Sequence, residues 1–130
     1  MSTRSTIAIY EGTQHLVTIY QQHDGYPSKP HGVGWKLAQF IKSGKFVNGL
    51  GSEKKVFNGM GCFAAALVEH LKDGPGGTYI VPKGQKEEYN YRVVGDLFAD
   101  PSYVTVACQG NESFKPGTPA AFMKWCEGQK

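Results

Sequence analysis

The sequence predicts an α+β protein, in which an antiparallel or mixed sheet of about five strands carries two to three packed helices. Alternating apolar patterns near the N-terminus and in the C-terminal half indicate strands, and helical spacing fills the stretch between them. A short helical segment then closes the chain. The expected order is β-β-α-α-β-β-β-α. With 130 residues, of which 40% are hydrophobic, the chain is long enough for one globular domain, residues 1–130.

The segment "TIAIYEGTQHLVTIY", residues 6 to 20, predicts a β-hairpin. Ile7 and Ile9 share one face of the first arm, and Val17 and Ile19 share one face of the second. The segment "EGTQ" supplies the turn between them. Both arms carry apolar residues on more than one face, so we expect other elements to cover the sheet.

Two helices are expected in the middle of the chain. Val33, Leu37 and Ile41 recur at helical spacing, and Gly44 is a helix stop. The stretch "CFAAALVEHLKDG" carries a clear apolar stripe, which the Gly/Pro-rich run 73–77 ends. The Gly/Asn-rich connection between the two helices, "KFVNGLGSEKKVFNGMG", has no convincing strand pattern.

The C-terminal half predicts three strands, "TYIVP", "EYNYRVV" and "SYVTVAC". In the second of these, Tyr89 and Tyr91 alternate with Arg92, as in a half-buried strand. Thr118 and Pro119 are typical of a helix N-cap and of the first helical position. The segment "AAFMKWCEG" then forms the final helix.

Composition excludes several classes of function. The formal net charge of +3 is a mild bias, so nucleic acid is not supported as a partner. Cys62, Cys108 and Cys126 are odd in number and widely spaced, which argues against a disulfide framework and a zinc site. We expect Cys62 to be buried beside an apolar stripe and inert. Without a membrane-spanning run or signal-like segment, we expect a cytoplasmic protein, in the host cytoplasm if phage-encoded, and no membrane partner.

The loop "QQHDGYPSKPHGVG", residues 21 to 34, is the most unusual stretch. In one hypothesis His23, Asp24, Tyr26 and His31 converge on a ligand, and Gly32 precedes a helix whose free N–H groups hold an anion. In the other, Asp24 closes a turn, Tyr26 packs on the sheet and His31 caps the helix. The residues His23, Asp24 and His31 could also bind a metal, but adjacent residues of an extended chain point apart. We therefore expect no metal and no cofactor.

A second candidate is the helix start at Asn58, Gly59 and Gly61, which has the outline of a phosphate-binding turn. Lys54 and Lys55 could add charge there. Close packing of the helix start against another element explains the same glycines and is the favoured interpretation.

A third candidate is "EEYNYRVV", in which Tyr89, Tyr91 and Arg92 could line an aromatic, cationic groove that stacks a base. Tyrosines on a strand also commonly pack on the face of a sheet, and that interpretation is favoured here too.

Several of these stretches together resemble a family of small proteins of phages and of bacteria that carry prophage-like genes. The resemblance rests on "TRSTIAIYEGTQHLVTIYQQHDGYPSKPHGVG", "FNGMGCFAAALVEHLK", "GGTYIVP" and "EEYNYRV", and it covers residues 3 to 126. Members share an Asp-Gly-Tyr-Pro loop and an Asn-Gly-Met-Gly helix start, and this chain departs by inserting Lys29-Pro30. The resemblance implies a phage accessory protein that counters host defence by binding a protein or sequestering a nucleotide signal.

Three hypotheses of function follow. The first is a non-catalytic binder of a small anionic or nucleotide-like ligand. The second is an interaction module that inhibits a host or phage enzyme through an aromatic patch on Tyr10, Tyr20 and Tyr26, with a homo-oligomer as a further option. The third is a hydrolase or nuclease that uses His23 or His31. Because no nucleophile or metal completes that set, we name no catalytic residue.

Overall fold

Three helices and eight strands make up the part of the chain that the computed structural model describes, residues 2–47, 56–99 and 101–130. In chain order these elements are β1 (Ser5–Glu11), β2 (Gln14–Gln21), α1 (Val33–Lys42), β3 (Lys45–Val47), β4 (Val56–Asn58), α2 (Met60–Leu71), β5 (Thr78–Val81), β6 (Tyr89–Asp96), β7 (Tyr103–Gly110), β8 (Phe114–Gly117) and α3 (Pro119–Glu127). The predicted α+β class is confirmed.

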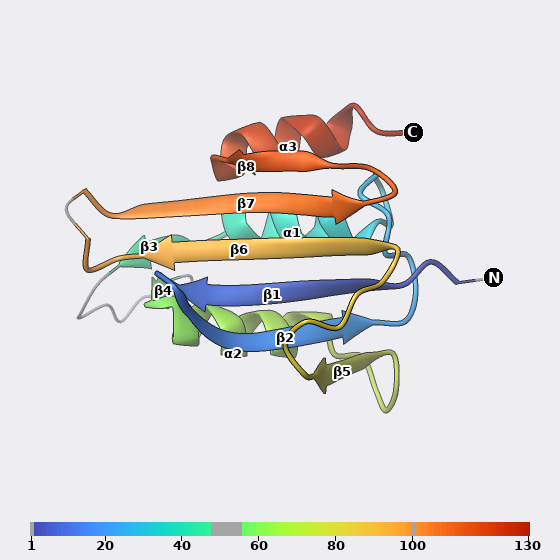
Figure 1. Ribbon diagram of the computed structural model, residues 1–130, viewed down its shortest axis with the longest axis horizontal. Helices are drawn as coiled ribbons and strands as arrows, with labels where there is room; N and C mark the ends of the chain where they lie inside the picture. Colours follow the sequence, from blue (N-terminus) through green and yellow to red (C-terminus); the bar gives the residue numbers. More distant parts are fainter. Residues whose placement is uncertain (1, 48–55, 100) are drawn as a thin grey trace.

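A mixed sheet of six strands forms the centre of the protein, in the order β5-β2-β1-β6-β7-β8 (Figure 1). The first hairpin pairs Ile7 with Ile19 and Ile9 with Val17, as the alternation predicts. β6 then returns beside β1 in a parallel pair, whereas the other four neighbouring pairs are antiparallel. The N-terminal and C-terminal halves of the chain therefore meet in the middle of the sheet.

Three short strands, β3, β4 and β8, were not predicted from the sequence. β3 and β4 pair in parallel as a separate small sheet, and β4 leads directly into α2. The expectation that no strand precedes the helix start at Asn58 is therefore wrong. β3 and β4 have only three residues each, and β8 has the sequence FKPG, so none of the three shows an alternating apolar pattern. Lys54 and Lys55 lie outside the described residues.

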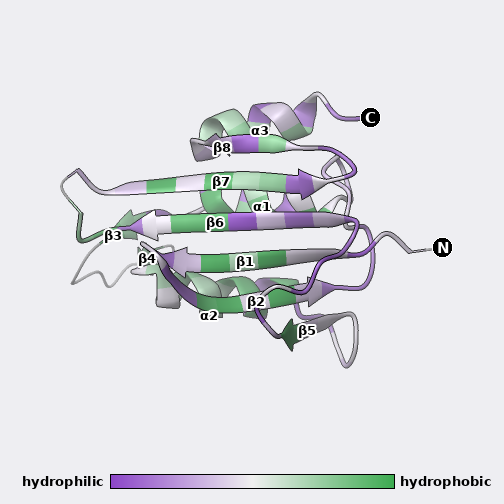
Figure 2. Cartoon of the chain, in the orientation of Figure 1, coloured by the Kyte–Doolittle hydropathy of each residue, from purple (hydrophilic) through white to green (hydrophobic). Residues whose placement is uncertain are grey.

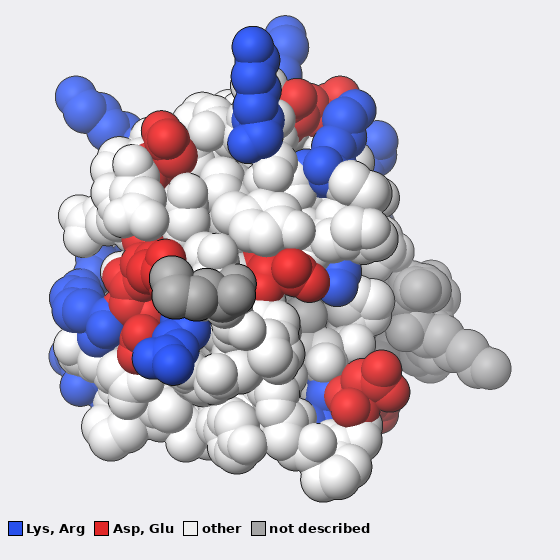
Figure 3. All heavy atoms as spheres, turned by 90° about the vertical axis from the view of Figure 1, so that its right-hand side faces the viewer, with Lys and Arg blue, Asp and Glu red and all other residues white. Residues whose placement is uncertain are grey.

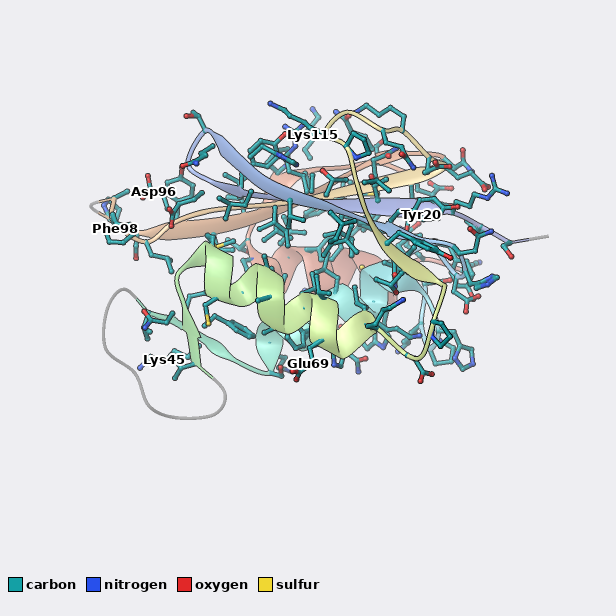
Figure 4. All side chains as sticks on the ribbon, turned by 90° about the horizontal axis from the view of Figure 1, so that it is seen from below. Tyr20, Lys45, Glu69, Asp96, Phe98 and Lys115 are labelled. Carbon is teal, nitrogen blue, oxygen red and sulfur yellow. The ribbon has the colours of Figure 1, made fainter. Side chains whose placement is uncertain are left out.

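The three helices lie on one face of the sheet (Figure 4). Beneath that face a single buried cluster joins strand residues such as Ile7 and Tyr91 to Leu37 of α1, Phe63 of α2 and Phe122 of α3. All five side chains are at most 1% exposed. Fully burying one side chain of this size stabilises a fold by about 1.5–3 kcal/mol, so this face supplies most of the driving force for folding.

Local sequence signals predict the N-cap of α3 correctly but not that of α1. The Thr118 side chain accepts a hydrogen bond of 3.1 Å from the backbone N–H of Ala121, which confirms the predicted N-cap of α3. α1 instead begins after Gly32 with no side-chain cap, so the interpretation of His31 as a cap is wrong. Cys62 is exposed, contrary to the expectation that it is buried, because the buried stripe of α2 runs through Met60 and Phe63.

The start of α1 packs closely against the sheet at a glycine. A Cβ atom on Gly34 would lie 2.8 Å from both Pro27 Cα and the Tyr91 hydroxyl oxygen. Gly61, in the first turn of α2, has open space where its Cβ would be. Close packing therefore requires a glycine at position 34, whereas position 61 has room for a side chain.

We expect Gly34→Ala to destabilise the protein by about 1–3 kcal/mol, since an extra methyl group must displace packed backbone and a buried ring. Gly61→Ala is the matched control, and we expect it to stabilise the fold by about 0.4–1 kcal/mol because alanine restricts the unfolded chain. Denaturant unfolding of both variants measures the difference. Equal effects of the two substitutions would contradict the packing described here.

Candidate functional site

A cavity of about 360 Å³ lies on the face of the sheet opposite the helices. Its floor is formed by the central strands, with Thr6, Ala8, Arg92 and Ala107 among its residues. The loop 82–88 from β5 to β6 crosses this face (Figure 1), and the hairpin between β7 and β8 borders the other side. Segments from four separate parts of the chain therefore enclose one hollow.

The hollow in the floor follows from the sizes of neighbouring side chains. In the ladder, Arg92 has Ala8 as its partner on β1 and Ala107 as its partner on β7. Two alanines leave open space on either side of one long side chain. In Figure 2 a hydrophilic band in the middle of β6 lies beside hydrophobic stretches of β1 and β7. Because successive side chains alternate between faces, the ring of Tyr91 points into the core instead.

Asn90 ties the loop above the cavity to the strands below it. Its Oδ1 accepts hydrogen bonds from the Thr6 hydroxyl at 2.8 Å and from the backbone N–H of Glu87 at 2.9 Å. Its Nδ2 donates to the backbone oxygens of Glu87 at 2.8 Å and of Gln109 at 3.4 Å. The Asn90 side chain therefore holds the loop 82–88 in a fixed position against the central strands.

Four cationic side chains line the cavity: Arg92 in the floor, Lys83 and Lys86 in the loop, and Lys115 in the hairpin. With the described residues, none of the four forms a hydrogen bond or an ion pair. No Asp or Glu is among the described lining residues, and the Glu87 carboxylate instead accepts a hydrogen bond from Gln85 Nε2 at 3.1 Å. A hollow lined by charges of one sign concentrates ions of the opposite sign.

The loop 22–32 has a different position, at the end of the sheet where the N-terminus lies (Figure 1). Backbone hydrogen bonds hold this loop in place. The Gly25 N–H donates to Thr3 O at 2.9 Å, and the Val33 N–H donates to Asp24 O at 2.7 Å. The buried Tyr91 hydroxyl donates to Gly25 O at 2.7 Å. A Cβ atom on Gly32 would lie 2.3 Å from Ser28 O, so this glycine is required by close backbone packing.

The polar side chains of this loop do not converge on one point. His23 shares a hydrogen bond of 2.7 Å with the Ser2 hydroxyl, and the Tyr26 hydroxyl donates to Asp24 at 3.1 Å. Burial and the Asp24 carboxylate both raise the pKa of Tyr26. His31 is exposed. Acidic and basic side chains are mixed on this end of the molecule, without a patch of one sign (Figure 3).

The helix start at Asn58, Gly59 and Gly61 lies at the opposite end of the sheet from the loop 22–32 (Figure 1). Gly59 has a φ of 90°, and a Cβ atom on Gly59 or Gly61 would contact nothing within 4 Å. The favoured interpretation, in which close packing of the helix start against another element explains these glycines, is therefore wrong. The structure does not bring this helix start together with the loop 22–32, and neither stretch lines the cavity that contains Arg92.

A second hollow, of about 460 Å³, lies between α1 and α3 on the helical side. Its lining is mostly apolar, with Ile41, Phe46 and Met123, and its charged residues are of both signs. It lacks the concentration of positive charge that distinguishes the first cavity.

Two of the three cysteines, Cys108 and Cys126, are buried. Burial raises the pKa of both Cys108 and Cys126 to about 12, so these thiols stay protonated near neutral pH. Within residues 2–47, 56–99 and 101–130, no three side chains of the metal-binding types gather into a site for an ion. In that same part of the chain, no helix has the length and apolar character that crossing a membrane requires.

Comparison of the protein with family models, with curated proteins and with solved structures gives no match. The chemistry of the cavity is therefore the basis for a functional proposal. Of the residues singled out in the sequence, Tyr10, Tyr91 and Arg92 line the cavity, although Tyr91 itself is buried. Lys83, Lys86 and Lys115 were not singled out, because nothing in the sequence indicates that their segments meet over β6.

We expect Asn90→Ala to release the loop 82–88, since four hydrogen bonds are lost at once and each contributes about 0.5–1.5 kcal/mol. Limited trypsin digestion measures this release as faster cleavage after Lys83 and Lys86. Asn111→Ala is the control, because its exposed side chain makes no hydrogen bond with the described residues. Identical digestion of the two variants would show that Asn90 does not hold the loop.

Proposed function

We propose that the protein is a non-catalytic binder of a small anionic, nucleotide-like ligand, held in the cavity on the helix-free face of the sheet. The observation that carries the proposal is the set of four cations that form no ion pair with the described residues, Lys83, Lys86, Arg92 and Lys115. Cavities of a few hundred Å³ suit small organic ligands, and 360 Å³ falls in that range.

Polar groups around the cations support the same conclusion. Ser113 and Gln109 also line the cavity and are exposed, and they offer hydroxyl and amide groups to the remainder of a ligand. Phosphate, carboxylate and sulfate groups are the anions that such a mixture of guanidinium and ammonium groups recognises. If the chain is a phage accessory protein, as its resemblance implies, it would act by binding and sequestering a nucleotide signal of the host.

The alternative, an inhibitor that docks on a host or phage protein, has less support. It depends on an exposed patch formed by Tyr10, Tyr20 and Tyr26. Tyr10 lines the cavity, Tyr20 packs against Tyr79 at the edge of the sheet, and Tyr26 lies in the loop 22–32. All three are only partly exposed, and Tyr26 belongs to the loop at the end of the sheet, whereas Tyr10 and Tyr20 lie on strands β1 and β2.

We expect nucleoside mono-, di- and triphosphates, or inorganic pyrophosphate, to raise the melting temperature at low salt. A ligand at 100 times its dissociation constant adds about 2.7 kcal/mol to the free energy of unfolding. The effect should shrink as salt is added, because salt screens exposed charges. Stabilisation by none of these anions in a thermal-shift panel would overturn the proposal.

The position of the site is tested with charge-neutral variants. We expect Lys86→Gln together with Lys115→Gln to weaken binding, whereas Lys45→Gln is the control. Figure 4 places Lys115 on the side of the sheet away from the helices and Lys45 on the helical side. His31→Ala tests the loop 22–32, and we expect it to bind the anion as the wild type does. Loss of binding in His31→Ala alone would move the site to that loop.

A further inference from the structure

Two of the cavity's cations share one aromatic ring. The Arg92 guanidinium carbon lies 5.2 Å from the centroid of the Tyr10 ring, and Lys83 Nζ lies 5.9 Å from the same centroid. Arg92 rises from the floor on β6, whereas Lys83 belongs to the loop above it. The Tyr10 end of the cavity therefore holds one cation from the floor and one from the loop.

The ring also restricts how these cations can bind. Tyr10 is adjacent to Ala8 on its own strand face, so its position is diagonal to Arg92 across the β1–β6 pair. A guanidinium held against an aromatic ring keeps its N–H groups available at its edge. Neither cation donates a hydrogen bond to any described residue. The guanidinium can grip two oxygens at once, while the ammonium acts as a point charge from above.

Resting on the proposed function, we propose that this end of the cavity recognises a phosphomonoester, held between Arg92 and Lys83 beside Tyr10. A phosphomonoester carries a charge of about −1.5 to −2 at pH 7, which two cations match. A phosphodiester or a carboxylate carries one negative charge and leaves one cation unpaired. The remainder of the ligand extends past Gln85 and Lys86 toward the β7–β8 hairpin, which supplies Lys115.

The test compares ligands that differ mainly in the phosphate. Adenosine 5′-monophosphate and its 3′,5′-cyclic diester carry the same base and sugar. By isothermal titration calorimetry we expect the monoester to bind the wild-type protein at least about tenfold more tightly than the cyclic diester, which corresponds to about 1.4 kcal/mol. Ribose 5-phosphate and inorganic phosphate then show whether the base, the sugar or the phosphate alone provides the affinity.

Variants at the two positions test the geometry. We expect Arg92→Lys, which keeps the charge but not the paired N–H groups, to weaken binding of the monoester about tenfold or more. We expect Lys83→Gln to lower the preference for the monoester over the diester. Lys86→Gln lies outside the Tyr10 contact, so it should weaken both ligands to a similar degree and leave their ratio unchanged. Circular dichroism and the melting temperature check that each variant is folded.

The outcomes separate this inference from the proposed function. Equal affinity of the wild-type protein for the monoester and the diester would overturn the phosphomonoester site while leaving an anion binder. Wild-type affinity and selectivity in Arg92→Lys and Lys83→Gln would overturn it as well. Failure of every anion in the panel to bind would overturn the proposed function itself.

Discussion

The parallel pairing of β1 with β6 is the constraint on which the rest of the structure depends. It fixes Tyr91 opposite Ile7 and Arg92 opposite Ala8. Consecutive residues of a strand face opposite sides, so one of these side chains enters the core and the other enters the cavity. A shift of one residue would exchange them and would place a guanidinium under the helices without a partner.

Tyr91 connects this pairing to the loop 22–32. Its ring is 1% exposed and packs against Phe122, and its hydroxyl donates to the backbone oxygen of Gly25. That bond satisfies a buried hydroxyl and at the same time fixes the path of the loop into α1. The density of glycine, proline and polar residues in this loop is explained mainly by such close backbone contacts. The unusual composition of this loop therefore reflects close backbone contacts that few residue types allow, and the candidate binding site lies elsewhere.

The helix-free face has a different physical character. Thr6 and Thr18 are almost fully buried there, at 2% and 3% exposed, yet the Thr6 hydroxyl bonds Asn90 and the Thr18 hydroxyl bonds His15. The loop 82–88 covers polar residues that are satisfied, and beside them lie cations that form no ion pair within residues 2–47, 56–99 and 101–130. Like charges near one another repel, although exposure to water screens the repulsion at Arg92 and the lysines. Under the proposed function, a bound anion would reduce that repulsion.

The sequence by itself determined the α+β class, the first hairpin, the alternation in β6 and the Thr118 cap of α3, because each depends on residues close together in the chain. It also indicated that Tyr91 and Arg92 differ in their surroundings. It could not reveal β3, β4 or β8, since none of these short segments shows an alternating apolar pattern. It could not place Cys62 on the exposed side of α2 either. Only the tertiary structure decided that β1 lies parallel to β6 and that Lys83 and Arg92 both lie over the ring of Tyr10. Those contacts join residues more than seventy positions apart, and pairing between distant strands is set by the packing of the whole sheet.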